Sequence, residues 1–262
     1  MSFPRVPLRP DRLQNLRWSF PSTYAFARDR LTVPLINTEI LRVAREYPIA
    51  FAQETEAWHP VAYLGDVDGA SNRFVGADGG WIARYVPFWL RVYPFVRDGD
   101  AVLVILDPAL VGVAGAHAFT DEAGALSSAA QDVSRQLLKA DLGAPALREA
   151  SGALVADGVA QVRPAEPSRA GDYLAFVAAA GSRELIGPRV AEWYARTPSA
   201  VELAIAAAFS NTFMPRVASK TVLLHEPQPA ETPHPAAIQP LYVPPAAPAD
   251  LDWLDTNEKI AF

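Results

Sequence analysis

The chain has 262 residues, a mass of 28.3 kDa and a formal net charge of −6, and half of its residues are hydrophobic. This composition excludes wholesale disorder, and the absence of cysteine excludes disulfide scaffolds, thiolate metal sites and cysteine nucleophiles. The acidic balance argues against a nucleic-acid partner, and we expect no transmembrane segment because no apolar run approaches the ~20 residues that a spanning helix needs.

The first half of the chain begins with an arm and continues as short apolar runs between turn residues. Residues 1–22 are rich in proline and arginine and are predicted to form an irregular, basic arm. A helix is predicted over 38–46, and Pro48 stops it. Strands are predicted at 49–52, 60–64, 73–75, 81–84 and 101–106, and a short helix from Pro87 to Val92. The run 101–106 is continuously apolar, which predicts a central strand buried on both faces.

The second half is rich in alanine, and its apolar residues favour helices. Helices are predicted over 121–141, 144–156, 183–195 and 198–209, and strands at 159–162 and 173–177. From residue 225 onward, prolines remove amide donors and fix φ, which predicts an extended tail. We therefore expect one α+β domain over 1–220, in which helices from the second half cover a mostly antiparallel or mixed sheet from the first half. The Pro-rich tail is predicted over 221–262.

The stretch from Tyr24 to Phe95 carries a distinctive pattern of aromatic residues and prolines. Its most specific part is Asp78-Gly79-Gly80-Trp81, followed by Tyr85-Val86-Pro87-Phe88-Trp89-Leu90-Arg91-Val92-Tyr93-Pro94-Phe95. This pattern resembles the SapC family of bacterial proteins, and weaker similarity continues to about Lys220. The resemblance implies no catalytic residue.

The resemblance implies an accessory or binding role in a bacterial uptake or modification system. Genes of this family are often neighbours of TonB-dependent receptors, cupin-like oxygenases and flavin-dependent halogenase-like proteins, which makes such proteins the expected partners. One alternative is a metal-dependent enzyme, or a subunit of one, in an oxidative or halogenating pathway. Since the family is named after a surface-layer locus, a structural surface-layer component is a second alternative.

Six aromatic residues gather within fifteen positions, and two arginines lie among them. The aromatic residues are Trp81, Tyr85, Phe88, Trp89, Tyr93 and Phe95. They favour either a core between sheet and helix or a ligand groove with aromatic walls and arginines for carboxylates. The best candidates for an exposed binding surface are Arg84, Trp89 and Arg91.

The end of the chain offers a second interaction hypothesis. Trp253 and Leu254 lie between aspartates, in a tail whose charged residues are six acids and Lys259. These two apolar residues are predicted to dock in a groove of a partner, on the basic arm of their own chain, or on a second copy, which would give a homo-oligomer.

The four histidines, His59, His117, His225 and His234, match no metal motif. None begins the His-x-Asp/Glu pattern of a facial triad, and no His follows four residues after another. We expect no cofactor, and His59 and His117 are the fallback candidates for a metal site. The first ten residues lack the apolar stretch of a signal peptide, so we expect a cytoplasmic protein, with leaderless export to the cell surface as the alternative.

Overall fold

The computed structural model describes residues 3–54, 56–65, 71–164, 173–177 and 189–211. The chain divides into two units, Met1–Arg216 and Val217–Phe262, and the described residues all belong to the first. The predicted tail over 221–262, with Trp253 and Leu254, therefore lies outside the described residues.

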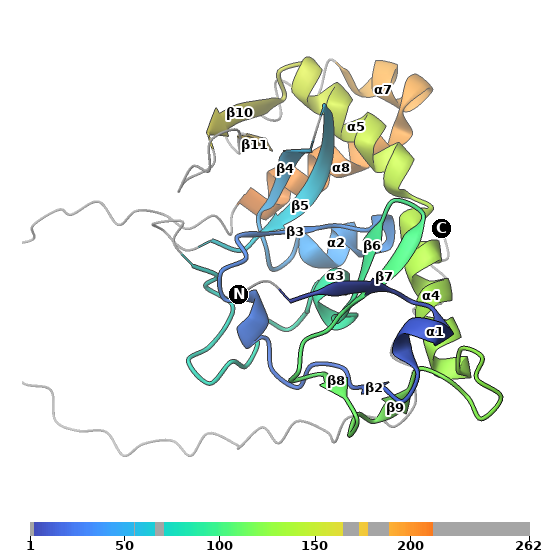
Figure 1. Ribbon diagram of the computed structural model, residues 1–262. Helices are drawn as coiled ribbons and strands as arrows, with labels where there is room; N and C mark the ends of the chain where they lie inside the picture. Colours follow the sequence, from blue (N-terminus) through green and yellow to red (C-terminus); the bar gives the residue numbers. More distant parts are fainter. Residues whose placement is uncertain (1–2, 55, 66–70, 165–172, 178–188, 212–262) are drawn as a thin grey trace, which may run out of the picture. The chain divides into compact units, whose positions relative to one another are not determined.

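The largest sheet has five strands in the order β10-β11-β4-β5-β3, and each neighbouring pair is antiparallel (Figure 1). The strands are β3 (Thr32–Pro34), β4 (Ile49–Glu54), β5 (Ala57–Tyr63), β10 (Ala160–Pro164) and β11 (Tyr173–Val177). Alternate residues of β4 point to opposite faces, as the two-residue period of a strand requires. Ile49 and Phe51 join the main core, whereas Ala50 joins a smaller apolar cluster with Val61 and Leu174.

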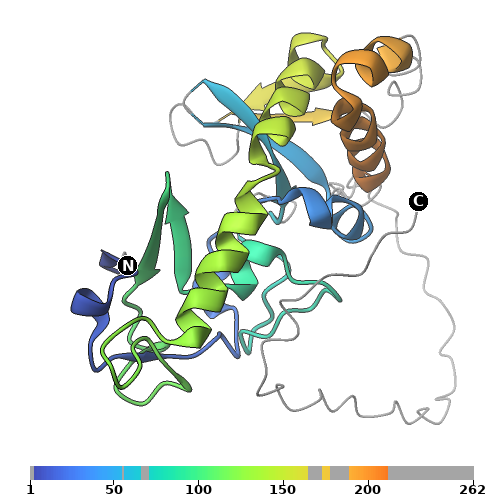
Figure 2. The same cartoon turned by 90° about the vertical axis from the view of Figure 1, so that its right-hand side faces the viewer.

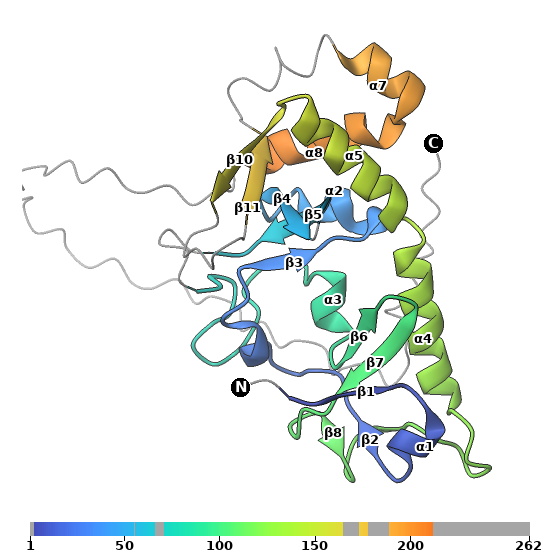
Figure 3. The ribbon, with the colours of Figure 1, turned by 45° about the horizontal axis from the view of Figure 1, so that its top comes forward.

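Helices from both halves of the chain complete the main core. They are α2 (Ile40–Val43), α5 (Ala144–Ala156), α7 (Val190–Arg196) and α8 (Pro198–Ser210). Helices α5 and α8 pack against each other and on β5 and β4 respectively (Figure 3). The hydroxyl of Ser210 accepts a hydrogen bond from the amide of Ile49 at 2.7 Å and donates to the carbonyl of Ala207 at 2.8 Å. The end of α8 is thereby fixed to the first residue of β4.

Two smaller antiparallel sheets lie beside α4 (Ser128–Asp141), and their orders are β1-β7-β6 and β8-β2-β9 (Figure 2). Their strands are β1 (Arg5–Pro7), β2 (Arg17–Trp18), β6 (Phe95–Asp98), β7 (Ala101–Ile105), β8 (Val111–Gly112) and β9 (His117–Ala118). An ion pair of 3.0 Å between Arg97 and Asp141 connects β6 to α4. None of the described helices is long and apolar enough to cross a membrane.

The prediction of an α+β fold is confirmed, but the prediction of an irregular arm over 1–22 is wrong. The arm contributes β1, α1 (Pro10–Leu13) and β2. Leu13 and Trp18 are fully buried, and the indole of Trp18 contacts the ring of Phe95 edge-on at 4.8 Å. The partner Phe95 lies far along the chain from Trp18, so no local sequence pattern could indicate this contact.

Several predicted boundaries also differ from the structure. The segments 73–75 and 81–84 are not strands, because only a single bridge between Val75 and Trp81 joins them. Helix α4 begins at Ser128 instead of residue 121, since the Ser127 hydroxyl caps it by accepting from the amide of Ala130 at 3.2 Å.

Three further expectations are only partly met. Strand β7 is central in its sheet, but Ala101 is exposed and only Val104 and Ile105 are buried. The helix predicted over 38–46 is split into the 3-10 helix η2 (Asn37–Glu39) and α2. Of the helix predicted over 183–195, α7 covers the part that the structure describes.

Candidate functional site

The aromatic cluster divides between core and surface. Phe88, Tyr93 and Phe95 are buried, whereas Trp81, Tyr85 and Trp89 are half-buried. The ring of Tyr93 stacks on that of Phe26, with centroids 4.0 Å apart. Three members of the cluster are thus buried, and the other three pack against the main core from partly exposed positions, with Trp89 in α3 (Phe88–Arg91).

A buried carboxylate lies beneath this surface. Glu39, which is 1% exposed, accepts hydrogen bonds from the amides of Ile36 (3.1 Å) and Phe88 (2.9 Å) and from the hydroxyl of Tyr85 (2.8 Å). Burial raises the pKa of Glu39, while these hydrogen bonds and the charge of Arg91 oppose the rise. Glu39 therefore holds together the start of α2 and the start of α3.

The hydroxyl of Tyr85 connects this carboxylate to an arginine. It donates to Glu39 and accepts from Nη2 of Arg91 at 3.1 Å. The guanidinium also lies over the rings of Tyr85 (5.2 Å) and Phe88 (5.9 Å). Burial and the charge of Glu39 raise the pKa of the Tyr85 hydroxyl well above its usual range, so the hydroxyl remains a donor. The position of Arg91 is thus set by its neighbours.

A second set of bonds holds the backbone of Tyr85. The indole Nε1 of Trp81 donates to the hydroxyl of Tyr47 at 2.8 Å and to the carbonyl of Tyr85 at 3.1 Å. The hydroxyl of Tyr47 donates to the same carbonyl. Because Trp81 also stacks on Phe74 at 6.0 Å, its indole is fixed within the core.

Glu46 fixes the preceding residue. Its Oε2 accepts from the amides of Arg84 at 2.7 Å and Tyr85 at 3.3 Å. The side chain of Arg84 is exposed, and the half-buried Trp89 contacts Phe88 edge-on at 5.2 Å. The backbone that carries Arg84 is therefore anchored while its side chain faces solvent.

We call the side chains of Arg84, Trp89 and Arg91 the basic–aromatic surface. Arg84 is exposed, and Trp89 and Arg91 are half-buried. Such a surface can bind carboxylates through the guanidinium groups and apolar groups through the indole. The residue that sequence reasoning missed is Glu39. The turn that it closes begins after Ile36, whose side chain cannot accept a hydrogen bond, so the sequence lacks the Ser or Thr of a capping box and gave no signal for Glu39.

The two fallback histidines belong to different sheets. His59 lies in β5, and burial lowers its pKa, Glu54 raises it and Arg148 lowers it again. His117 lies in β9 against the ring of Trp18, and burial lowers its pKa. Among the residues described, no three His, Asp or Glu side chains are grouped to hold a metal ion.

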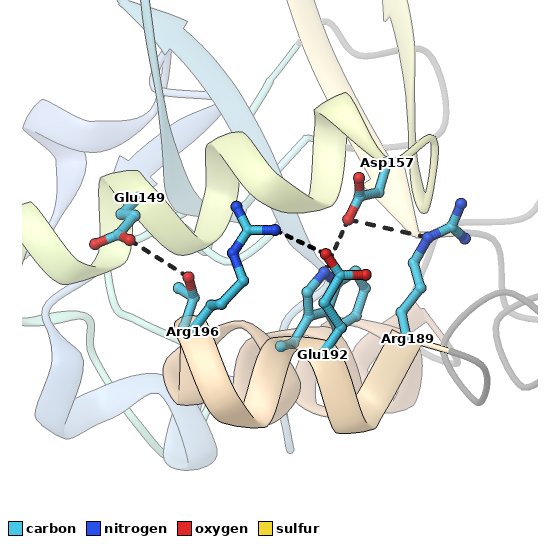
Figure 4. Close-up of polar contacts among 7 residues, drawn as sticks. Glu149, Asp157, Arg189, Glu192 and Arg196 are labelled. Carbon is cyan, nitrogen blue, oxygen red and sulfur yellow. Dashed lines mark hydrogen bonds and ion pairs between the residues drawn. The ribbon is translucent and has the colours of Figure 1, made fainter.

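Another polar cluster lies between α5 and α7 (Figure 4). Asp157 accepts from the indole Nε1 of Trp193 at 2.8 Å and pairs with Arg189 at 3.9 Å. The hydroxyl of Thr197 donates to Glu149 at 3.3 Å. These contacts fasten α7 and the start of α8 to α5, so the cluster has a structural role.

The match to a family model extends beyond the aromatic stretch. The model of the SapC family matches residues 8–165, which is more than half of the chain. The matched region includes Glu39, Tyr85 and the whole basic–aromatic surface. Comparison with curated proteins and with solved structures gives no match. The match confirms the resemblance seen in the sequence, and the chain belongs to the SapC family.

Proposed function

We propose that the protein is a non-catalytic accessory protein that binds a protein partner through the basic–aromatic surface. The observation that carries the proposal is the chain of contacts from Glu39 through the hydroxyl of Tyr85 to Arg91. A guanidinium already held in place loses less conformational freedom on binding, which lowers the entropic cost of association.

The composition of the surface supports this role. Trp and Arg are enriched among the residues that dominate protein–protein binding energy. Arg84 and Arg91 are both cationic in a chain of net charge −6, so they favour a partner with an acidic segment. The family resemblance suggests an oxygenase, a halogenase-like protein or a receptor system as that partner.

The test uses tagged protein recovered from its native cells, followed by mass spectrometry and metal analysis of the same eluate. Arg84→Glu reverses the charge of an exposed side chain that forms no hydrogen bond or ion pair with the described residues. The substitution should therefore remove a stoichiometric partner without changing the melting temperature. Arg148→Glu is the matched control, because Arg148 is exposed on α5, far along the chain from this surface.

Three outcomes would overturn the proposal. Retention of the partner by Arg84→Glu would place the interface elsewhere. Stoichiometric metal without a partner would favour the metal-dependent enzyme and direct mutagenesis to His59 and His117. Ordered self-assembly at the cell surface would favour the surface-layer component.

A further inference from the structure

Two glutamates, one at each end of α2, bind the segment that leads into α3. Glu39 directly precedes α2 and accepts from the hydroxyl of Tyr85 at 2.8 Å and from the amide of Phe88 at 2.9 Å. Glu46 follows α2 and accepts from the amide of Arg84 at 2.7 Å. Figure 1 shows α2 beside α3. The side of α2 that carries the two glutamates therefore faces α3 and the chain that leads into it.

Arg42 lies between these glutamates on the same side of the helix. It comes three residues after Glu39 and four residues before Glu46. Residues three or four apart on a helix are neighbours, with Cβ atoms about 5–6 Å apart. The helical hydrogen bonds continue past α2, since the amide of Tyr47 donates to the carbonyl of Val43 at 2.8 Å. Arg42 therefore starts from the side of α2 that meets the basic–aromatic surface.

Each glutamate connects Arg42 to one arginine of that surface. Glu46, one turn after Arg42, holds the backbone amide of Arg84. Glu39, one turn before Arg42, accepts from the phenol to which Arg91 donates at 3.1 Å. The short path through each contact places Arg42 next to the two arginines, although it comes from a different helix.

The electrostatics of the tyrosine agree with this placement. Burial and the charge of Glu39 raise the pKa of Tyr85, and the charges of Arg91 and Arg42 oppose the rise. Two guanidinium groups from separate elements thus act on the same hydroxyl.

The solvent side of α2 resembles the basic–aromatic surface in its chemistry. The side chain of Arg42 is exposed, and that of the adjacent Leu41 is 63% exposed. The carboxylates of Glu39 and Glu46 are engaged with backbone amides. This part of the protein therefore presents guanidinium groups to a partner, with apolar side chains beside them.

We propose that Arg42 and Leu41 extend the basic–aromatic surface onto α2, and that the extended surface binds an acidic segment of a partner that carries apolar side chains between its carboxylates. Arg42, Arg84 and Arg91 attract such a segment by charge complementarity. Leu41 and Trp89 contact its apolar side chains. This extension rests on the function proposed above and adds to it the second helix and the chemistry of the partner.

The test measures binding of a synthetic peptide, in which aspartates flank leucines, to the full chain. The same peptide with asparagine in place of each aspartate is the reference and should bind only weakly. Arg42→Glu should weaken binding of the acidic peptide about tenfold or more. Arg148→Glu makes the same change of charge at an exposed position on α5 and should leave this binding unchanged.

A second variant separates recognition from folding, because Arg42→Glu brings a like charge beside Glu39 and Glu46. Arg42→Gln removes the charge alone, so it should change the melting temperature little. It should weaken binding of the acidic peptide less than Arg42→Glu does, and it should make that binding less sensitive to salt. A purely structural role would lower the melting temperature and leave the salt dependence unchanged, which would overturn the proposal.

Comparison with Arg84→Glu distinguishes the remaining outcomes. Loss of peptide binding in both Arg42→Glu and Arg84→Glu would support the extended surface. Loss in Arg84→Glu alone would overturn the extension onto α2 and leave the proposed function standing. Equal binding of the two peptides, or no loss in either variant, would overturn both. A dimer of the protein that Arg42→Glu dissociates, with peptide binding unchanged, would assign Arg42 to self-association and overturn the extension.

Discussion

The hydroxyl of Tyr85 donates a hydrogen bond of 2.8 Å to Oε2 of Glu39. The same hydroxyl accepts from Arg91, so a neutral phenol stands between a buried carboxylate and a half-buried guanidinium. This arrangement keeps Glu39 and Arg91 apart while each has a polar partner. One side chain thereby belongs to the core through its hydrogen bonds and supports the basic–aromatic surface through its ring.

Replacing Tyr85 by phenylalanine tests the value of this hydroxyl. Tyr85→Phe keeps the ring but removes one of the donors that satisfy Glu39, and a buried acceptor that loses its partner costs about 1–3 kcal/mol. We expect a fall of this size in the free energy of unfolding, measured by urea denaturation. Tyr194→Phe is the control, since Tyr194 is 71% exposed and should change stability by less than about 0.5 kcal/mol. Equal effects of the two substitutions would contradict the role assigned to the hydroxyl.

The buried carboxylate predicts a pH dependence of stability. Burial raises the folded-state pKa of Glu39 above its unfolded value of about 4.3, so the folded protein binds the proton more tightly than the unfolded chain does. The stability that Glu39 contributes is therefore complete below about pH 4.3 and is lost as the pH rises through the folded-state pKa.

Glu39→Gln removes this titration and isolates the effect. The free energy of unfolding of the wild type minus that of Glu39→Gln should decrease as the pH rises from about 4. Other titrating groups cancel in this difference, which urea denaturation at a series of pH values would measure. A difference that stays constant or grows with pH would show that the carboxylate is ionised at no net cost.

The N-terminal arm is predicted to be essential for the fold. Leu13 is fully buried, so Leu13→Ala should lower the free energy of unfolding by about 2–5 kcal/mol. Leu142→Ala makes the same chemical change at a residue that is 80% exposed and should have little effect. Thermal and urea unfolding of the two variants would check this. An unchanged free energy of unfolding in Leu13→Ala would contradict the packing of the arm and favour the irregular arm that the sequence predicted.

Local patterns in the sequence were sufficient for much of the fold. Short apolar runs between turn residues placed β4 and β5, the strand predicted at 173–177 coincides with β11, and Thr197 followed by Pro198 placed the start of α8. The burial of Trp18 could not be found in this way, because its partners Phe95 and Phe119 are distant in sequence.

The same distinction applies to the candidate site. The aromatic and arginine pattern was enough to select Arg84, Trp89 and Arg91 as candidates for a surface position. The pairing of Glu39 with Tyr85 was not accessible, because a glutamate at the start of a helix is typical of solvent-exposed positions and its partner lies 46 residues later.

The pairing of β4 with β11 has a consequence for how the protein is made. Ala52 on β4 pairs with Leu174 on β11, and the amide of Ile49 donates to the hydroxyl of Ser210, 161 residues further on. Both of these partners of β4 are therefore synthesised long after the strand itself. At roughly 5–20 residues per second of translation, the nascent chain keeps one edge of β4 open for on the order of 10 s. An unpaired edge of this kind is a template for pairing with other chains, so we expect aggregation to be most favourable during this interval of synthesis.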